Sequence, residues 1–214
     1  MSDETFFHGE TWQQLIPFLE QLPEAVKLVV WGDPDGGRFE QEALQLGRAL
    51  AERFDILHFE QRPRQPTYPY YPIFGVMGVG AEEIDYRVRL IGLPAGYQIN
   101  SLVGAIQAVS FRASNLEPRT RIQLSRLPAA AQIDLELFTA AEDESGPLVA
   151  SLAAGLAVAS PKVRTFIVMV DVFPQALVRY SIRQLPHTVI NGRVHIAGVV
   201  DEPTMLQHIA RSLQ

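Results

Sequence analysis

Three consecutive carboxylates, Glu142, Asp143 and Glu144, form the densest group of chemically active side chains in the sequence. Carboxylates this close together would act as an acid–base pair or bind a hard divalent cation through oxygen. The alternative is a solvated loop in which Asp143 caps the helix expected from Pro147, since aspartate is a preferred N-cap residue. We favour the capping interpretation, because no further ligand set accompanies the three carboxylates.

A second acidic stretch begins like a calcium-binding loop, with Asp33, Asp35 and Gly36. The later oxygen ligands and the terminal glutamate of such a loop are missing at the required spacing. These residues are therefore interpreted as a turn.

His187 and His195 flank the dipeptide Asn191-Gly192, which predicts a two-residue type I′ hairpin turn between two apolar runs. With that turn, Thr188 pairs with His195, and His187 points to the opposite face of the hairpin. We therefore expect the two imidazoles not to meet. The sequence predicts no metal site, and it gives no reason to expect a bound cofactor.

The sequence contains no cysteine. Without a thiol there is no thiolate nucleophile and no disulfide exchange by this chain. A whole class of redox mechanisms is excluded.

Charge and hydropathy limit the partners and the location. The net charge of −6 argues against a nucleic-acid ligand. No window approaches the roughly 18 uninterrupted apolar residues of a membrane span, and the acidic start differs from a secretory signal. We expect a cytoplasmic protein that does not bind membranes.

The spacing of apolar residues predicts an α/β chain with the same order of elements in each half. The first half is expected to hold helices at 11–22, 38–54 and 96–111 and strands at 26–31, 56–59, 73–79 and 86–91. The second half is expected to hold strands at 133–138, 163–170, 188–190 and 193–196 and helices at 147–159, 173–182 and 202–213.

The halves form an internal repeat with offsets of 107, 114 and 106 residues, carried by the pairs Val26 and Ile133, Pro72 and Pro186, and Gly92 and Gly198. The segment 112–127 has the composition of a crossing between domains. We therefore expect one domain over 1–116, with an extra N-terminal helix, and a second over 117–214.

This pattern resembles the tandem thioredoxin-fold proteins known as protein disulfide oxidoreductases or glutaredoxin-like proteins, and the related amino-terminal region of the alkyl hydroperoxide reductase flavoprotein subunit. The resemblance covers about residues 24–213 and is carried by the strings at 91–102 with 108–110 and at 185–192 with 197–198. It implies two tandem thioredoxin-like domains, each a mixed central sheet flanked by helices. It also implies a redox-active Cys-x-x-Cys at the start of the first helix of the second domain.

The sequence departs from that pattern at the motif itself. Asp143 and Gly146 stand where the two cysteines would be. The field of a helix N-terminus that lowers a cysteine pKa would instead favour the Asp143 carboxylate. The family's activity is therefore not expected here, and no residue is predicted to be catalytic.

Two proline segments are candidates for binding. In the proteins that this chain resembles, the backbone beside a cis-proline pairs with extended peptide or glutathione, which implies such a role for Leu185 before Pro186. Tyr71 and Pro72 are the counterparts in the first half. The alternative, slightly favoured, is that both prolines serve fold geometry alone, with Pro186 a candidate for a cis bond at the start of a strand.

The connector 61–72 holds four prolines and no helical pattern, so the helix expected at this place in a thioredoxin-like domain is predicted to be missing. Its loss would uncover part of one sheet face near Tyr68, Tyr70, Tyr71 and Phe74. These rings would either form a protein interface or fold back as core, and we hold the two interpretations equal.

The sequence as a whole favours a redox-inactive thioredoxin-like protein that binds another protein, or itself, through the tyrosine-rich connector or the Pro186 edge. The alternative is a non-thiol enzyme, metal-assisted or glutathione-binding, at the Asp143 loop.

Overall fold

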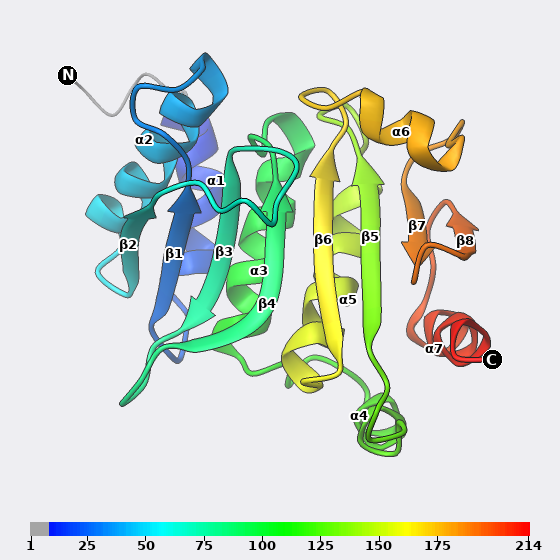
Figure 1. The fold of residues 1–214 in the computed structure, drawn as a ribbon. Helices are drawn as coiled ribbons and strands as arrows, with labels where there is room; N and C mark the ends of the chain where they lie inside the picture. The colour runs from blue at the N-terminus through cyan, green and yellow to red at the C-terminus, as the bar shows by residue number, and fades with distance from the viewer. Residues whose placement is uncertain (1–8) are drawn as a thin grey trace.

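The computed structural model describes residues 9–214 of the chain (Figure 1). The first eight residues of the predicted first domain lie outside this range. The first half contains α1 (Gly9–Leu19), β1 (Val26–Trp31), α2 (Arg38–Arg53), β2 (Leu57–Arg62), β3 (Ile73–Gly78), β4 (Ile84–Ile91), a 3-10 turn (Gly96–Gln98) and α3 (Ile99–Ser110). The second half contains α4 (Pro118–Ser125), β5 (Ile133–Thr139), α5 (Gly146–Ala159), β6 (Val163–Met169), α6 (Gln175–Tyr180), β7 (His187–Ile190), β8 (Val194–Ala197) and α7 (Glu202–Ser212).

All eight strands belong to one mixed sheet with the order β2-β1-β3-β4-β6-β5-β7-β8. Within each half the pairing follows the same scheme. The first strand pairs in parallel with the second and antiparallel with the third, and the third pairs antiparallel with the fourth. The expected mixed α/β architecture is confirmed.

The two halves are joined through the sheet itself. Strand β4 pairs in parallel with β6, from Val88 opposite Thr165 to Ile91 opposite Val168. The mixed central sheets expected for the two domains are therefore joined edge to edge into one continuous sheet. The division into domains at 116 and 117 stays a prediction.

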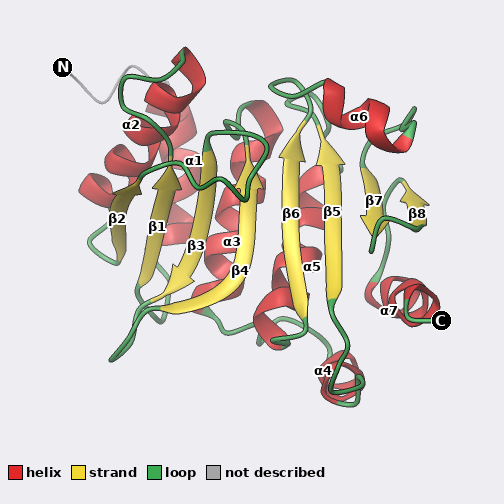
Figure 2. Cartoon of the chain, viewed as in Figure 1, coloured by secondary structure: helices red, strands yellow, loops and turns green. Residues whose placement is uncertain are grey.

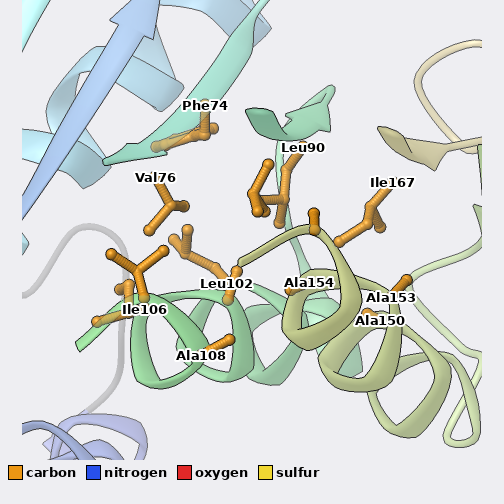
Figure 3. Packing of buried hydrophobic residues seen from close by; sticks show 14 of the residues in the cluster. Phe74, Val76, Leu90, Leu102, Ile106, Ala108, Ala150, Ala153, Ala154 and Ile167 are labelled. Atoms are coloured by element: carbon orange, nitrogen blue, oxygen red, sulfur yellow. The ribbon is translucent and has the colours of Figure 1, made fainter. Parts of the chain in front are cut away.

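Most of the helices cover one face of the sheet, here called the covered face (Figure 2). Strand alternation sends Leu135 and Leu137 of β5 to this face, where both are fully buried. Glycine and alanine allow α3 and α5 to approach closely, and a Cβ on Gly104 would lie 2.0 Å from Ser151 Oγ. Figure 3 shows this core, with Leu102 and Ile106 of α3 and Ala150, Ala153 and Ala154 of α5 beneath Phe74, Val76, Leu90 and Ile167 of the strands.

Of the residues that the structure describes, two segments cover the opposite face, called the open face. The connector 63–72 crosses in front of β1, β3 and β4, and α6 lies above the upper ends of β5 and β7 (Figure 1). Between β2 and β3 the structure shows this connector in place of a helix, as the proline content predicted. In the described range 9–214, no helix is long and apolar enough to cross a membrane.

Candidate functional site

Both oxygens of the Asp143 carboxylate accept hydrogen bonds close to their own loop. One oxygen accepts hydrogen bonds from the backbone N–H groups of Ser145 (3.0 Å) and Gly146 (3.1 Å), and the other accepts from the Thr139 hydroxyl (2.9 Å). The N-cap residue of α5 is Ser145, and Asp143, two residues earlier, accepts from the N–H groups of Ser145 and of the first helical residue, Gly146. The geometry supports the capping interpretation.

The same loop leaves no space for a side chain at position 146. A Cβ on Gly146 would lie 2.1 Å from Thr139 Oγ1 and 3.0 Å from Gln98 Nε2. Gln98 is fully buried and donates to the carbonyl oxygens of Ala140 (2.8 Å) and Asp143 (2.9 Å). The space that the second cysteine of a Cys-x-x-Cys would need is therefore occupied by polar side chains.

The flanking carboxylates do not converge with Asp143 on a common point. Glu142 and Glu144 are exposed whereas Asp143 is half-buried, and Glu144 accepts a hydrogen bond from the Tyr97 hydroxyl at 2.6 Å. Among residues 9–214, no group of three or more acidic, histidine or cysteine side chains could hold a metal ion.

The loop before α2 is organised by a residue that sequence reasoning missed. Glu40, only 5% exposed, accepts a hydrogen bond from the Asp33 N–H at 2.8 Å and pairs with Arg64. Burial raises the pKa of Glu40, but Arg64 and the backbone donors outweigh it and hold the pKa below its ordinary value. Asp33 Oδ1 accepts from the Asp35 N–H, as in a local turn.

Both proline segments have the same local geometry. The Tyr71–Pro72 and Leu185–Pro186 peptide bonds are cis. The carbonyl of Pro72 accepts from the Gly92 N–H at 2.8 Å, and that of Pro186 accepts from the Gly198 N–H at the same distance.

The residues before these prolines keep their main chain unpaired. Within the described residues, neither Leu185 nor Tyr71 uses its backbone N–H or carbonyl in a hydrogen bond. Both side chains are half-buried against the apolar cluster of the open face. The free main-chain groups are suitable for pairing with an extended peptide.

His187 and His195 do meet, so the expectation that they point to opposite faces is wrong. His187 Nε2 lies 3.0 Å from His195 Nδ1. The turn at Asn191-Gly192 forms, but Ile190 pairs with Val194 and leaves Arg193 as an extra residue in the loop. This shifts the register by one residue and moves His195 to the face of His187.

Three of the four aromatic residues singled out in the sequence fold back onto the open face. Tyr68 lies against Trp31 with ring centroids 6.2 Å apart, and Tyr70 stacks on Phe173 at 4.7 Å. Tyr71 packs against the same cluster. All three tyrosines remain half-buried, so they are both core and accessible surface.

Phe74 does not belong with these tyrosines, and its expected place beside them is wrong. It is fully buried among the helices of the covered face. Successive residues of a strand point to opposite faces, and Ile73 takes the open face instead.

A groove of about 620 Å³ lies on the open face and is bounded by Tyr68, Tyr70 and α6. Its floor is formed by the outward side chains of three neighbouring strands: Arg87, Arg89 and Ile91 of β4, Arg164, Phe166 and Val168 of β6, and Asp134, Glu136 and Phe138 of β5. Its volume is in the range of ligand-binding clefts.

Most of the charged side chains that line the groove have an oppositely charged partner. Arg164 binds both carboxylate oxygens of Asp134 at 2.6 Å. Arg89 is buried and binds both oxygens of Asp85, at 2.9 and 2.5 Å. Burial raises the pKa of Asp85, but Arg89 outweighs it and holds the pKa below its ordinary value.

A tyrosine beside the groove carries a strongly shifted pKa. The Tyr180 hydroxyl donates to Glu136 at 2.7 Å. Burial and this carboxylate raise the pKa of Tyr180 to about 12. Arg179 lies 3.8 Å from the other oxygen of Glu136.

The alternation of Asp134 and Glu136 with leucines was visible in the sequence. The arginines that face them come from strands more than 20 residues away, and only the order of strands in the sheet brings them together. The groove was therefore missed at the level of the sequence.

No protein family matches the sequence, and no curated protein matches it significantly. Solved structures do match. The amino-terminal N/C domain of the alkylhydroperoxide reductase AhpF of Enterococcus faecalis has a TM-score of 0.85 and 19% identity, covering 95% of this chain and 100% of that one. A mutant form of the same reductase has a TM-score of 0.85 and 20% identity, and the match covers 96% of this chain and 100% of that one.

A protein disulfide oxidoreductase from Aeropyrum pernix has a TM-score of 0.82 and 21% identity, covering 95% of this chain and 92% of that one. These similarities show that the chain has the thioredoxin-like fold of these proteins, without any cysteine in its sequence.

Proposed function

We propose that this chain is a redox-inactive thioredoxin-like protein that binds another protein, or a second copy of itself, through its open face. The absence of cysteine supports the redox-inactive part, because thiol–disulfide exchange needs a thiolate. An insulin-reduction assay on the pure chain is expected to be negative. The proposal keeps the cytoplasmic location expected from the sequence, which subcellular fractionation would test.

The observation that carries this proposal is the groove on the open face, bounded by the half-buried rings of Tyr68 and Tyr70. Tyrosine is enriched at protein interfaces because it offers a large apolar ring with a polar end. The unpaired main chain of Tyr71 follows directly after Tyr70, so side-chain and backbone contacts are available side by side. In this proposal the groove and the tyrosines beside it recognise the partner, and the chain carries out no thiol-based redox chemistry.

Site-specific photo-crosslinking tests the proposal. A photoreactive p-benzoylphenylalanine at position 70 should crosslink a defined protein in native-host cells, or a second copy of the chain. The same substitution at Phe111, an exposed ring at the end of α3, is the matched control. A band found with both variants, or with neither, would contradict the proposal, and light scattering after size exclusion separates self-association from a foreign partner.

No contact in the described structure favours the alternative, a non-thiol enzyme at the Asp143 loop. The carboxylate already accepts three hydrogen bonds from its own loop. These bonds use three of the about four acceptor positions of a carboxylate, which leaves little capacity for a reacting proton or a cation.

A further inference from the structure

Arg87 is the anomalous residue of the groove. The β3–β4 ladder is irregular between Val76 and Gly78, and Arg87 adopts a positive φ of 61° there. The Asp85 carboxylate accepts a hydrogen bond from the Arg87 N–H at 2.7 Å and supports this bend. Bulges of this kind redirect a side chain, and here Arg87 lines the groove.

The Arg87 guanidinium makes no hydrogen bond and no ion pair within the described residues, and its interaction with the Asp85 carboxylate is electrostatic only. Its Nε atom is buried and makes no hydrogen bond, and its side chain forms no ion pair. The adjacent Asp85 already has both oxygens bound by Arg89. A buried donor without an acceptor is costly, and an acceptor brought by a ligand would remove that cost.

Charge complementarity indicates what the ligand should carry. Four arginines and two carboxylates line the groove, although the whole chain has a net charge of −6. Arg164 is paired with Asp134, and Arg179 lies 3.8 Å from Glu136, so within the described residues neither groove carboxylate forms an ion pair with Arg87. The fork of an arginine matches the two oxygens of a carboxylate.

The other part of the groove is apolar. Ile91, Phe138 and Val168 are buried at the upper ends of their strands, while Phe166 and Tyr70 remain half-buried beside them. A ligand that fills the groove would therefore place a carboxylate at Arg87 and an apolar side chain on these rings.

We propose that the groove binds an acidic segment of a partner polypeptide, with a carboxylate on Arg87 and a neighbouring apolar side chain between Phe166 and Tyr70. This inference rests on the proposed function and specifies the partner's chemistry. Arginine and tyrosine are the side chains that most often dominate binding energy at protein interfaces. The groove runs across three strands, which suits an extended segment.

Fluorescence anisotropy with a labelled peptide tests the inference on the full chain. The probe is fluorescein-Gly-Glu-Leu-Glu-Phe-Glu-Gly-amide, and its control carries Gln in place of each Glu. We expect the acidic peptide to bind at least about tenfold more tightly than the Gln peptide, and to weaken as salt rises. Equal binding of the two peptides, or no saturable binding, would overturn the inference.

Variants locate the contact. Arg87→Gln should weaken the acidic peptide about tenfold, and Arg87→Lys, which keeps the charge without the fork, should weaken it less. Arg121→Gln removes an exposed arginine of α4 and should leave the affinity within about twofold. An unchanged affinity of Arg87→Gln, in a variant whose circular dichroism matches that of the parent chain, would refute the role of Arg87.

Amide chemical shifts separate this inference from the proposed function. Shifts at Arg87, Phe166 and Glu136 on addition of the acidic peptide would support it. Shifts confined to Leu185 and Tyr71 would overturn the groove as the site and leave the proposed function standing. A partner that crosslinks at position 70, and whose affinity changes neither with salt nor in Arg87→Gln, would also overturn this inference and leave the proposed function standing.

Discussion

His187 Nε2 and His195 Nδ1 lie 3.0 Å apart across the β7–β8 hairpin. At this distance one imidazole nitrogen donates and the other accepts, so the contact fits at most one of the two histidines being protonated. Burial lowers the pKa of His187, and a positive charge on His195 lowers it further.

This pair predicts a loss of stability in mild acid. The folded pKa of His187 lies below its ordinary value of 6.5, so the unfolded chain binds more protons between the two values. The contribution of neutral His187 to the free energy of unfolding is complete above about pH 6.5 and is lost as the pH falls through the folded pKa. Urea unfolding from pH 7.5 to 5 should show a shallower pH slope for His187→Gln than for the parent chain. His58→Gln, on the exposed edge strand β2, is the control; equal slopes for all three proteins would count against the pair.

Position 146 should tolerate no side chain. Gly146→Ala places a Cβ 2.1 Å from Thr139 Oγ1 and should cost about 1–3 kcal/mol of unfolding free energy. Gly80→Ala, whose Cβ would make only ordinary contacts, should stay within about 0.5 kcal/mol. Denaturant unfolding measures both. Thr139→Ala should cost less in the Gly146→Ala background than alone, and an additive double variant would argue against the clash.

Asp143 should matter for stability and not for binding. Asp143→Ala removes the acceptor of three hydrogen bonds and should cost about 0.5–2 kcal/mol, as the loss of a helix cap does. Asp143→Asn keeps an acceptor for the N–H groups and should lose less. Anisotropy with the acidic peptide should be unchanged in both variants. Weakened peptide binding with unchanged stability would assign the loop a functional role instead.

Tyr180 should ionise late. Its pKa is raised to about 12, above its ordinary value of 10.0. The contribution of the protonated Tyr180 hydroxyl to the free energy of unfolding is therefore complete below about pH 10, and it is lost as the pH rises through about 12. Ultraviolet titration at 295 nm should show a component near pH 12 that is missing from Tyr180→Phe. The variant also loses the hydrogen bond to Glu136, at about 1 kcal/mol. An identical titration of the two proteins would rule out this assignment.

Local signals predicted the elements well and their pairing only in part. The Asn191-Gly192 turn is present, with a positive φ at both residues. The sequence did not reveal that Arg193 stays outside the ladder, and that single residue decides which face His195 takes. A local motif fixes a turn, whereas the register also depends on packing of the whole strand.

The candidate site shows the same division. The capping role of Asp143 followed from residue type and from the expected start of α5. The groove depends on the lateral pairing of β4 with β6, a contact between strands from different halves of the chain. No periodicity within either half reports that contact, so Arg87 and Arg164 gave no signal of sharing one surface.

The β4–β6 ladder also limits how the protein can move. Its hydrogen bonds run directly beneath the groove, and on the other side α3 and α5 meet at Gly104 and Ser151. A hinge motion between the two halves would break the main-chain hydrogen bonds between β4 and β6 and would also separate the closely packed helices α3 and α5. The floor of the groove is therefore rigid, and the parts of its wall that can adjust to the proposed partner are the connector 63–72 and α6.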